Sequence, residues 1–174
     1  MRRWARSLEP ATESESERIS TAALALLRQH GWTKVLTFLS MPGEVDLSNL
    51  HNQAGFEFHV TRTPAQGPLT VHRLTDDLEQ HPFGYLQPGR EAPLAEVSTL
   101  EVVLVPGVLF DRQGGRLGHG KGYYDQLLAS SQPQPYLVGV TLERRVVDRV
   151  PIDTTDVIMD GLLTEEGFNP RSNR

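Results

Sequence analysis

The sequence predicts a three-layer α/β/α fold with a mainly parallel central sheet, formed by a single domain over residues 1–174. Apolar runs typical of buried strands alternate along the chain with segments of helical spacing, and this alternation predicts parallel strands covered on both faces. The length of 174 residues lies below the roughly 250 residues at which one core usually divides. No internal repeat, low-complexity segment or linker splits the chain, so a single core is expected.

The composition is that of an ordinary globular protein, with 38% hydrophobic and 22% charged residues. A formal net charge of -5 argues against a nucleic acid or an anionic membrane as partner, so any phosphate site must be local. The absence of cysteine excludes disulfides and thiolate chemistry. No signal peptide and no apolar run of about 18 residues is found. We expect a cytoplasmic protein, a monomer, with small-molecule partners.

The first half of the chain predicts helix, strand, helix and strand in that order. Residues 18–31 place apolar side chains at helical spacing after a polar segment and end at a glycine. Residues 33–40 predict a short buried strand, and residues 45–55 a second helix closed by glycine. Residues 56–63 alternate as a half-buried strand does, whereas residues 69–74 fit either a strand or an edge hairpin partner.

The second half contains the most apolar strand of the chain, over residues 99–110, with Pro106 and Gly107 near its end. A strand of this kind is buried on both faces, so we expect it in the middle of the sheet. Residues 75–93 are expected to be a loop. The remaining predicted elements are a helix over 123–131 and strands over 135–142 and 157–164, the last after a turn at 151–156.

The segment "GGRLGHGKGYYDQLL", residues 114–128, is expected to connect the central strand to the following helix. Open α/β sheets bind ligands at the carboxyl ends of their strands. The glycines allow positive φ angles and close approach to an anion, and Arg116 and Lys121 add positive charge. The alternative is a flexible surface turn. Two cations among the glycines, followed by paired tyrosines, favour a phosphate-binding loop.

Two familiar nucleotide-binding motifs, the P-loop and the dinucleotide-binding fingerprint, do not fit this segment. Gly122 stands where a P-loop has the Ser or Thr that holds magnesium, and strictly alternating glycines do not fit G-x-G-x-x-G. If phosphates bind here, carboxylates must hold the magnesium. Asp125 and Asp156 are the candidates. Both alternatives stay open, because Asp125 also suits the dipole of a helix first turn and acidic residues in turns usually cap or face solvent.

The stretch "VPGVLFDRQGGRLGHGKGYYD" resembles the signature of the 5-formyltetrahydrofolate cyclo-ligase family in both order and spacing. The similarity continues through "FLSMPGEVD", "PYLVGV" and "VPIDTTDVIMDGLLT", so it spans nearly the whole chain. The resemblance implies ATP- and magnesium-dependent conversion of 5-formyltetrahydrofolate to 5,10-methenyltetrahydrofolate, within folate one-carbon metabolism, with release of ADP and phosphate. The formyl oxygen would be activated by phosphoryl transfer before N10 closes the ring. Such a reaction needs mainly positioning and charge neutralisation.

The resemblance also implies roles for individual residues. Catalytic roles fall on Arg116, Lys121 and Tyr123, and magnesium on Asp125 and Asp156. The implied ATP-binding residues are Arg2, Arg6, Arg116, Leu117, Gly118, His119, Gly120, Lys121, Gly122, Tyr123 and Tyr124. The implied folate-binding residues are Leu39, Glu44, His119, Gly120, Lys121, Gly122 and Tyr123, with Glu44 accepting hydrogen bonds from pterin NH groups. Arg62 would serve a phosphate or the glutamate tail of the folate.

Three positions are singled out by comparison with the family pattern. Arg145 stands where the family usually has Gln, and Gln87 where it usually has Glu. His119 occupies a variable position and is expected to face solvent. Two alternatives to the enzyme remain: a nucleotide- or folate-binding relative without catalysis, and a sugar-phosphate isomerase or acyl-CoA-transferase type of protein. The retained carboxylates argue against the first, and the tyrosine-aspartate ending argues against the second.

Overall fold

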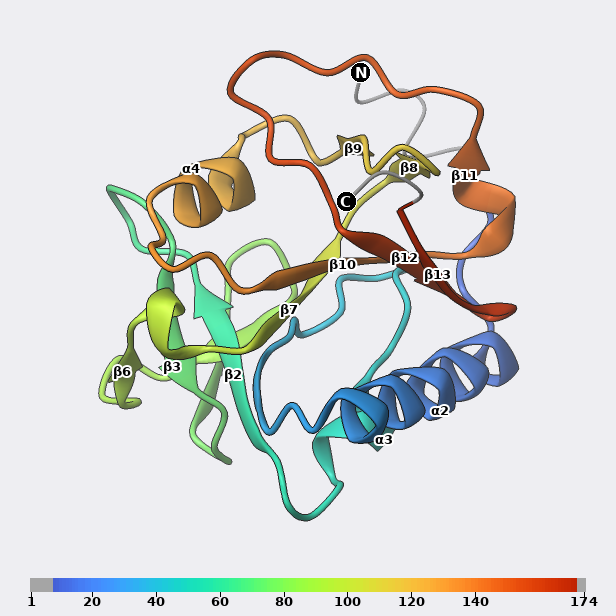
Figure 1. Ribbon diagram of the computed structural model, residues 1–174. Coiled ribbons are helices and arrows are strands. Elements are labelled where there is room, and N and C mark those ends of the chain that lie inside the picture. The colour runs from blue at the N-terminus through green and yellow to red at the C-terminus, as the bar shows by residue number, and fades with distance from the viewer. Residues whose placement is uncertain (1–7, 172–174) are drawn as a thin grey trace.

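The computed structural model describes residues 8–171, and its middle layer is an eight-stranded sheet (Figure 1). The strand order is β13-β12-β10-β7-β1-β2-β3-β6, and the neighbouring strands from β12 to β2 run parallel. The strands of this sheet are β1 Lys34–Leu36, β2 Glu57–Arg62, β3 Thr70–Arg73, β6 Leu94–Ala95, β7 Val102–Pro106, β10 Tyr136–Val140, β12 Gly161–Thr164 and β13 Gly167–Pro170. The predicted parallel sheet is therefore confirmed, with antiparallel strands only at its margins.

Helices and a small second sheet cover the two faces of the central sheet. Helices α2 Glu13–His30 and α3 Ser48–His51 lie on one face, while α4 Tyr123–Ala129 lies on the other (Figure 1). The second face also carries a three-stranded sheet, β11-β8-β9. Its strands are β8 Leu109–Asp111, β9 Arg116–Leu117 and β11 Val146–Val147. One apolar core fills each interface, so the predicted three-layer fold is confirmed.

Helix α2 begins and ends with strong local signals. Thr12 and Glu15 form a capping box, in which the Thr12 side chain accepts a hydrogen bond from the Glu15 backbone and the Glu15 carboxylate accepts one from Thr12. Gly31 ends the helix with φ 68°, a left-handed conformation that favours glycine. Ile19, Ala23 and other apolar side chains at helical spacing are fully buried against the sheet.

Strand β7 lies between β1 and β10, as expected for the most apolar strand. It is shorter than predicted, because the chain turns sharply at Gly107 and the next residues form β8 of the other sheet. A Cβ atom at Gly107 would lie 2.7 Å from the Phe110 ring and 3.1 Å from Arg116 Cγ, so only glycine fits. The glycine-rich segment therefore does not lead directly from the central strand to the helix. It passes first through the β8–β9 hairpin.

The segment 75–93, expected to be a loop, contains a two-stranded hairpin, β4 Leu78–Gln80 and β5 Leu86–Pro88. Arg62 holds this hairpin at its base, since its Nη2 donates to Glu79 Oε1 at 2.6 Å and its Nη1 donates to the Pro88 carbonyl. Gln87 also donates to Glu79, at 3.0 Å. The Arg62 contacts come from strand β2, outside this segment, and each hairpin strand has only three residues, so the local pattern rich in proline and glycine did not indicate the hairpin.

Two further predictions need correction in the first half of the chain. The helix expected over residues 45–55 is a single turn, Ser48–His51. Strand β2 is not half-buried, because the consecutive residues Phe58, His59 and Val60 are all buried. It pairs with β1 on one side and with β3 on the other, which settles residues 69–74 as its antiparallel partner. Within residues 8–171 no helix combines the length and the apolar character needed to cross a membrane.

Candidate functional site

The base of the glycine-rich segment is fixed by Asp111, which is 2% exposed. Its Oδ1 accepts hydrogen bonds from the backbone NH groups of Gln113 and Gly115, at 2.9 and 2.8 Å, and its Oδ2 accepts one from Val150 at 2.7 Å. A buried carboxylate with three backbone donors stabilises the turn between β8 and β9. Asp111 is thus a structural residue that sets the start of the loop.

The glycines of the segment fall into two groups. A Cβ atom at Gly114 would lie 2.4 Å from the Met159 carbonyl oxygen, and one at Gly115 would lie 2.5 Å from Asp111 Oδ2. These two glycines allow close packing. Gly120 and Gly122 have φ angles of 87° and 62°, yet a Cβ atom there would meet nothing within 4 Å. The second pair therefore shapes the backbone beside open space, where a ligand can approach.

Arg116 and Asp125 lie opposite each other below the loop. Arg116 Nη2 donates to Asp125 Oδ2 at 2.7 Å, and the two side chains are only 7% and 16% exposed. The other carboxylate oxygen, Asp125 Oδ1, accepts from the Val157 backbone at 3.1 Å. Asp125 therefore connects β9, α4 and the segment that contains Asp156, a role beyond the helix dipole considered from sequence.

Asp156 lies in the turn before β12, where its Oδ2 accepts a hydrogen bond from the Asp153 backbone at 2.7 Å. Its chain neighbour Val157 donates to Asp125, so the segments carrying the two predicted magnesium ligands adjoin. Across the part of the chain that the structure describes, no group of three or more His, Asp or Glu side chains is placed to hold a metal. A pair of carboxylates still fits magnesium, which commonly binds one or two of them together with substrate phosphates.

His119 and Glu44 join the loop to the segment after β1. His119 Nε2 lies 3.0 Å from Glu44 Oε1, and Glu44 Oε2 accepts from the Met41 backbone at 2.9 Å. The hydrogen bond to Glu44 raises the pKa of His119 above its usual value of 6.5. His119 is exposed as expected, with 48% of its side chain accessible, and the pair with Glu44 is an additional contact that the sequence did not indicate.

Lys121 lies between two aromatic rings. Its Nζ atom is 5.4 Å from the ring centroid of Phe83 and 5.5 Å from that of Tyr123. Phe83 belongs to the turn of the β4–β5 hairpin and is 71% exposed. Cation–π contacts of this kind bring the hairpin, the loop and the start of α4 together. Lys121 and Tyr123 thus lie where a ligand between hairpin and loop would meet them.

Leu117, Gly118 and Tyr124 have mainly structural contacts. The Leu117 carbonyl accepts from Val108 at 2.7 Å, within the β8–β9 hairpin. A Cβ atom at Gly118 would lie 2.7 Å from Arg116 Nη1. Burial raises the pKa of the Tyr124 hydroxyl to about 12, although that hydroxyl is hydrogen-bonded to Thr61. Tyr124 thus packs under the loop, with the Arg116 guanidinium 5.8 Å from its ring centroid.

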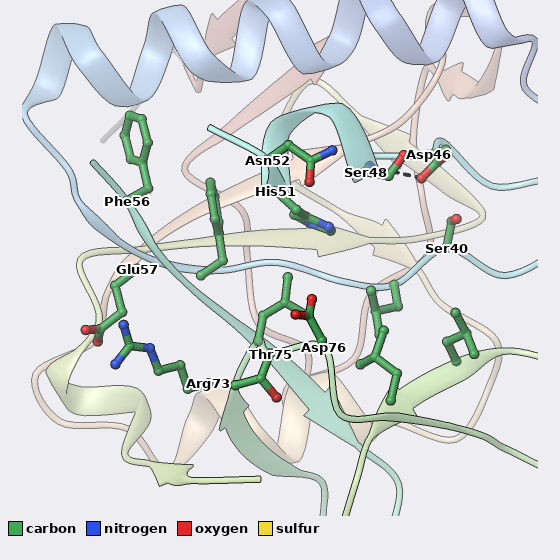
Figure 2. Close-up of a pocket in the computed structure, with 15 residues that line it drawn as sticks. Ser40, Asp46, Ser48, His51, Asn52, Phe56, Glu57, Arg73, Thr75 and Asp76 are labelled. Carbon is green, nitrogen blue, oxygen red and sulfur yellow. Dashed lines mark hydrogen bonds between the residues drawn. The ribbon is translucent and has the colours of Figure 1, made fainter. Parts of the chain in front are cut away.

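A groove of about 570 Å³ is lined by Leu39 and by residues of α3 and of the β4–β5 hairpin, and Figure 2 shows Ser48 and His51 on its α3 side. The other lining residues are Ser40, Asp46, Ser48, His51, Asn52, Phe56, Glu57, Phe58, Arg73, Leu74, Thr75, Asp76, Leu78 and Leu86. His51 Nε2 lies 3.2 Å from Thr37 Oγ1, and burial lowers the pKa of His51 to about 4. The imidazole is therefore neutral near pH 7.

Apart from Leu39, the residues of this groove were not predicted from the sequence. One signal was available: the segment "DLSNLHN", residues 46–52, places several polar side chains just after the first strand. The same residues fall within the helix predicted over residues 45–55. The two early arginines of the predicted ATP site, Arg2 and Arg6, lie outside the described residues. Arg62 is committed to the hairpin, which argues against the ligand role expected for it.

Comparison with known proteins gives a consistent result. The model of the 5-formyltetrahydrofolate cyclo-ligase family matches residues 1–165. A 5-formyltetrahydrofolate cyclo-ligase of Saccharomyces cerevisiae is 31% identical over 185 residues, with 88% of this chain and 86% of the relative covered. The mouse enzyme of the same name is 28% identical, with 76% and 73% covered. The solution structure of Aquifex aeolicus 5,10-methenyltetrahydrofolate synthetase superposes with a TM-score of 0.77, at 30% identity, over 91% of this chain and 82% of that one.

Proposed function

Because the chain belongs to the 5-formyltetrahydrofolate cyclo-ligase family, whose members are ATP-dependent ligases, we propose that it converts 5-formyltetrahydrofolate to 5,10-methenyltetrahydrofolate with ATP and magnesium. The products are the methenyl compound, ADP and phosphate. One observation carries the proposal furthest. The His119–Glu44 pair joins the glycine-rich loop to the segment after β1, so the regions expected to hold ATP and folate meet at the carboxyl ends of the parallel strands.

The nucleotide phosphates bind along the loop in this proposal. Gly120 and Gly122 border open space, so a phosphate can approach their backbone without meeting a side chain. Lys121 is exposed beside that space and supplies a full positive charge. Arg116, which lies in β9 and pairs with Asp125, contributes a further positive charge. Arg2 and Arg6 complete the ATP contacts expected from the family resemblance.

Asp125 and Asp156 are the proposed magnesium ligands. Their segments adjoin through the hydrogen bond from Val157 to Asp125, and oxygen ligands suit this hard cation. Magnesium, when bound with ATP, would neutralise negative charge on the phosphates. The Asp125 carboxylate has a second role in this proposal, because its hydrogen bond with Arg116 also orients the guanidinium.

The folate binds with its pterin beside Leu39 and Glu44, and the groove accommodates the p-aminobenzoyl part. Leu39, Leu78 and Leu86 line the groove, and apolar side chains of this kind suit an aromatic ring. Glu44 keeps an acceptor for pterin NH groups, since a carboxylate has lone pairs beyond those used by His119 and Met41.

The reaction balances as two substitutions. The formyl oxygen attacks the γ-phosphorus, so that a new P–O bond forms and the bond to ADP breaks. N10 then attacks the formyl carbon, the C–O bond to phosphate breaks, and the proton of N10 leaves. Arg116 and Lys121 stabilise the negative charge of the transferring phosphoryl group, and Tyr123 positions the reacting end. No side chain has to form a covalent bond.

The proposal is tested by following the absorbance of the methenyl product with 5-formyltetrahydrofolate, ATP and magnesium. Lys121→Ala should lower kcat/KM by about 100-fold, the scale of one lost charge stabiliser. The chain has only one other lysine, Lys34 at the amino end of β1, and Lys34→Ala is the matched control with unchanged rates. A folded wild-type protein that binds ATP without turnover would support the non-catalytic binding relative instead.

A further inference from the structure

Two successive arginines after strand β10 hold the chain just before helix α2. They end the short 3-10 helix η2, Glu143–Arg145. Arg144 Nη2 donates to the Pro10 carbonyl at 2.9 Å, and Arg145 Nη2 donates to the Glu9 carbonyl at 2.7 Å. Charged donors to carbonyl oxygens are among the stronger hydrogen bonds in proteins. The residues preceding α2 are thus bound to the carboxyl end of β10.

Arg145 differs from Arg144 because it also reaches the segment after β1. Its Nη2 atom donates to the Gly43 carbonyl at 3.0 Å, and this same carbonyl accepts from the Ala11 backbone at 3.3 Å. Arg144 instead pairs with Glu15 in the first turn of α2. Of the two arginines, Arg145 is therefore the one that contacts both the chain near residue 9 and the segment that carries Glu44.

The contact at Gly43 leads directly to the proposed folate site. Glu44 follows Gly43 in the chain, and its carboxylate pairs with His119 of the glycine-rich loop at 3.0 Å. Arg145 and Glu44 also line one small hollow with Gly107, at the carboxyl end of β7. A single guanidinium is therefore connected through Gly43 and Glu44 to the loop on one side, and to the N-terminal segment on the other.

Arg145 lies in surroundings that are unfavourable for a charged side chain. It is only 6% exposed, and its Nε atom has no hydrogen-bond partner. Among residues 8–171 no carboxylate forms an ion pair with it, and its guanidinium donates to backbone carbonyls. A buried charge that gains no ion pair costs stability. The contacts of Arg145 therefore indicate a role in positioning the segments that it joins, more than a role in stabilising the fold.

We propose that Arg145 is a positioning residue that fixes the N-terminal segment and the Glu44 segment relative to each other, and so couples the ATP and folate sites. The inference rests on the proposed function, because the N-terminal segment carries the expected phosphate ligands Arg2 and Arg6 and Glu44 the expected pterin contact. Loss of the bridge displaces both binding segments while leaving Lys121 and the reacting groups in place. Binding should therefore weaken much more than the chemical step.

Steady-state kinetics of three variants tests this role. Arg145→Gln should raise KM for both ATP and 5-formyltetrahydrofolate about tenfold, with kcat changed less than about threefold, the pattern of lost binding rather than lost chemistry. Arg145→Lys, which keeps a charged donor, should recover part of the loss. Arg144→Gln is the matched control and should leave both KM values within about twofold. Equal effects of the two Gln variants, or unchanged KM values in a folded Arg145→Gln protein, would overturn the assignment.

Amide hydrogen exchange of the unliganded protein gives a readout that does not depend on activity. Arg145→Gln should accelerate exchange at both Ala11 and Glu44, whose NH groups donate to the Gly43 and Met41 carbonyls. Arg144→Gln should accelerate exchange only near Ala11. Unchanged exchange at Glu44 in Arg145→Gln would refute the bridge. A wild-type protein without turnover, but with the expected exchange pattern, would contradict the proposed function and leave the bridge standing.

Discussion

Arg116 and Asp125 form an ion pair of 2.7 Å in which both side chains are largely buried. The sequence assigned them to different ligands, the first to phosphate and the second to magnesium. In the structure they also stabilise each other, and the Val157 backbone occupies the second oxygen of Asp125. Each side chain is thus the buried charge partner of the other, so a substitution at one residue removes the ion pair that orients the other.

The Arg116–Asp125 pair can be measured by a double-mutant cycle. Asp125→Ala should lower the free energy of unfolding by about 3 kcal/mol, because it leaves a buried guanidinium without its carboxylate. Arg116→Met should cost less, since Asp125 keeps the Val157 NH group. The double variant should be less destabilised than the sum of the two singles. Urea unfolding at fixed pH provides the values, and simple additivity would show that the pair has no coupling.

The His119–Glu44 pair predicts a dependence of stability on pH. Glu44 raises the pKa of His119 above 6.5, so the folded state keeps the proton to higher pH than the unfolded state. The contribution is complete below pH 6.5 and is lost as the pH rises through the folded pKa. Because His119 is 48% exposed, the effect should stay below about 1 kcal/mol. Unfolding of the wild type and of His119→Asn, compared between pH 5.5 and 8.5, should converge at the alkaline end.

His51 predicts the opposite dependence. Burial lowers the pKa of His51 to about 4. Between this pKa and the usual value of 6.5, the unfolded state therefore binds a proton that the folded state does not bind. Stability should therefore fall as the pH drops from about 6.5 to about 4, by on the order of 2 kcal/mol. A His51→Asn variant should show a flatter profile over this range in urea unfolding. Equal slopes for the two proteins would mean that the pKa of His51 is not lowered in the folded state.

The glycines of the loop predict two classes of variant. Gly114→Ala should destabilise the protein by more than about 2 kcal/mol, because the new methyl group would meet the Met159 carbonyl in a left-handed backbone. Gly120→Ala meets open space and should cost only about 1 kcal/mol, for its positive φ angle. Thermal unfolding separates the two. If Gly120→Ala nevertheless raises KM for ATP, the open space is part of the nucleotide site.

Most of the fold could be predicted from local patterns. The apolar run of β7, the amphipathic spacing of α2 and its glycine end, and the alternation of strands with helices each depend on neighbouring residues. The β4–β5 hairpin could not be predicted in this way, because each of its strands has only three residues and its contacts with Arg62 come from a separate strand. The length of α3 was overestimated for a related reason, since its polar residues border the groove instead of continuing a helix.

The candidate site, like the fold, could be predicted from the sequence only in part. The order of the residues indicates the glycine-rich loop, and the family resemblance implies one site for His119 and Glu44, which lie in contact in the structure. The sequence could not show that Arg145 binds two carbonyls from separate segments, or that Asp111 holds three backbone NH groups. Partners of these kinds are backbone atoms, which leave no trace in the identity of the residues that carry them.

The β4–β5 hairpin, which borders the groove, is attached unevenly along its length. Arg62 holds the base of the hairpin to the central sheet, whereas the contact of Lys121 with Phe83 at its turn is a cation–π interaction beside an exposed ring. Contacts of that kind are worth about 0.5–1 kcal/mol, close to thermal energy. Beyond Arg62, the Tyr85 hydroxyl donates to Thr63 Oγ1 at 3.0 Å, so the hairpin is also held near its turn on the β5 side. The Phe83 end of the turn should therefore be the loosest part of the hairpin, and its movement would break one contact between a ring and an ammonium group while the Arg62 and Tyr85 hydrogen bonds stay in place.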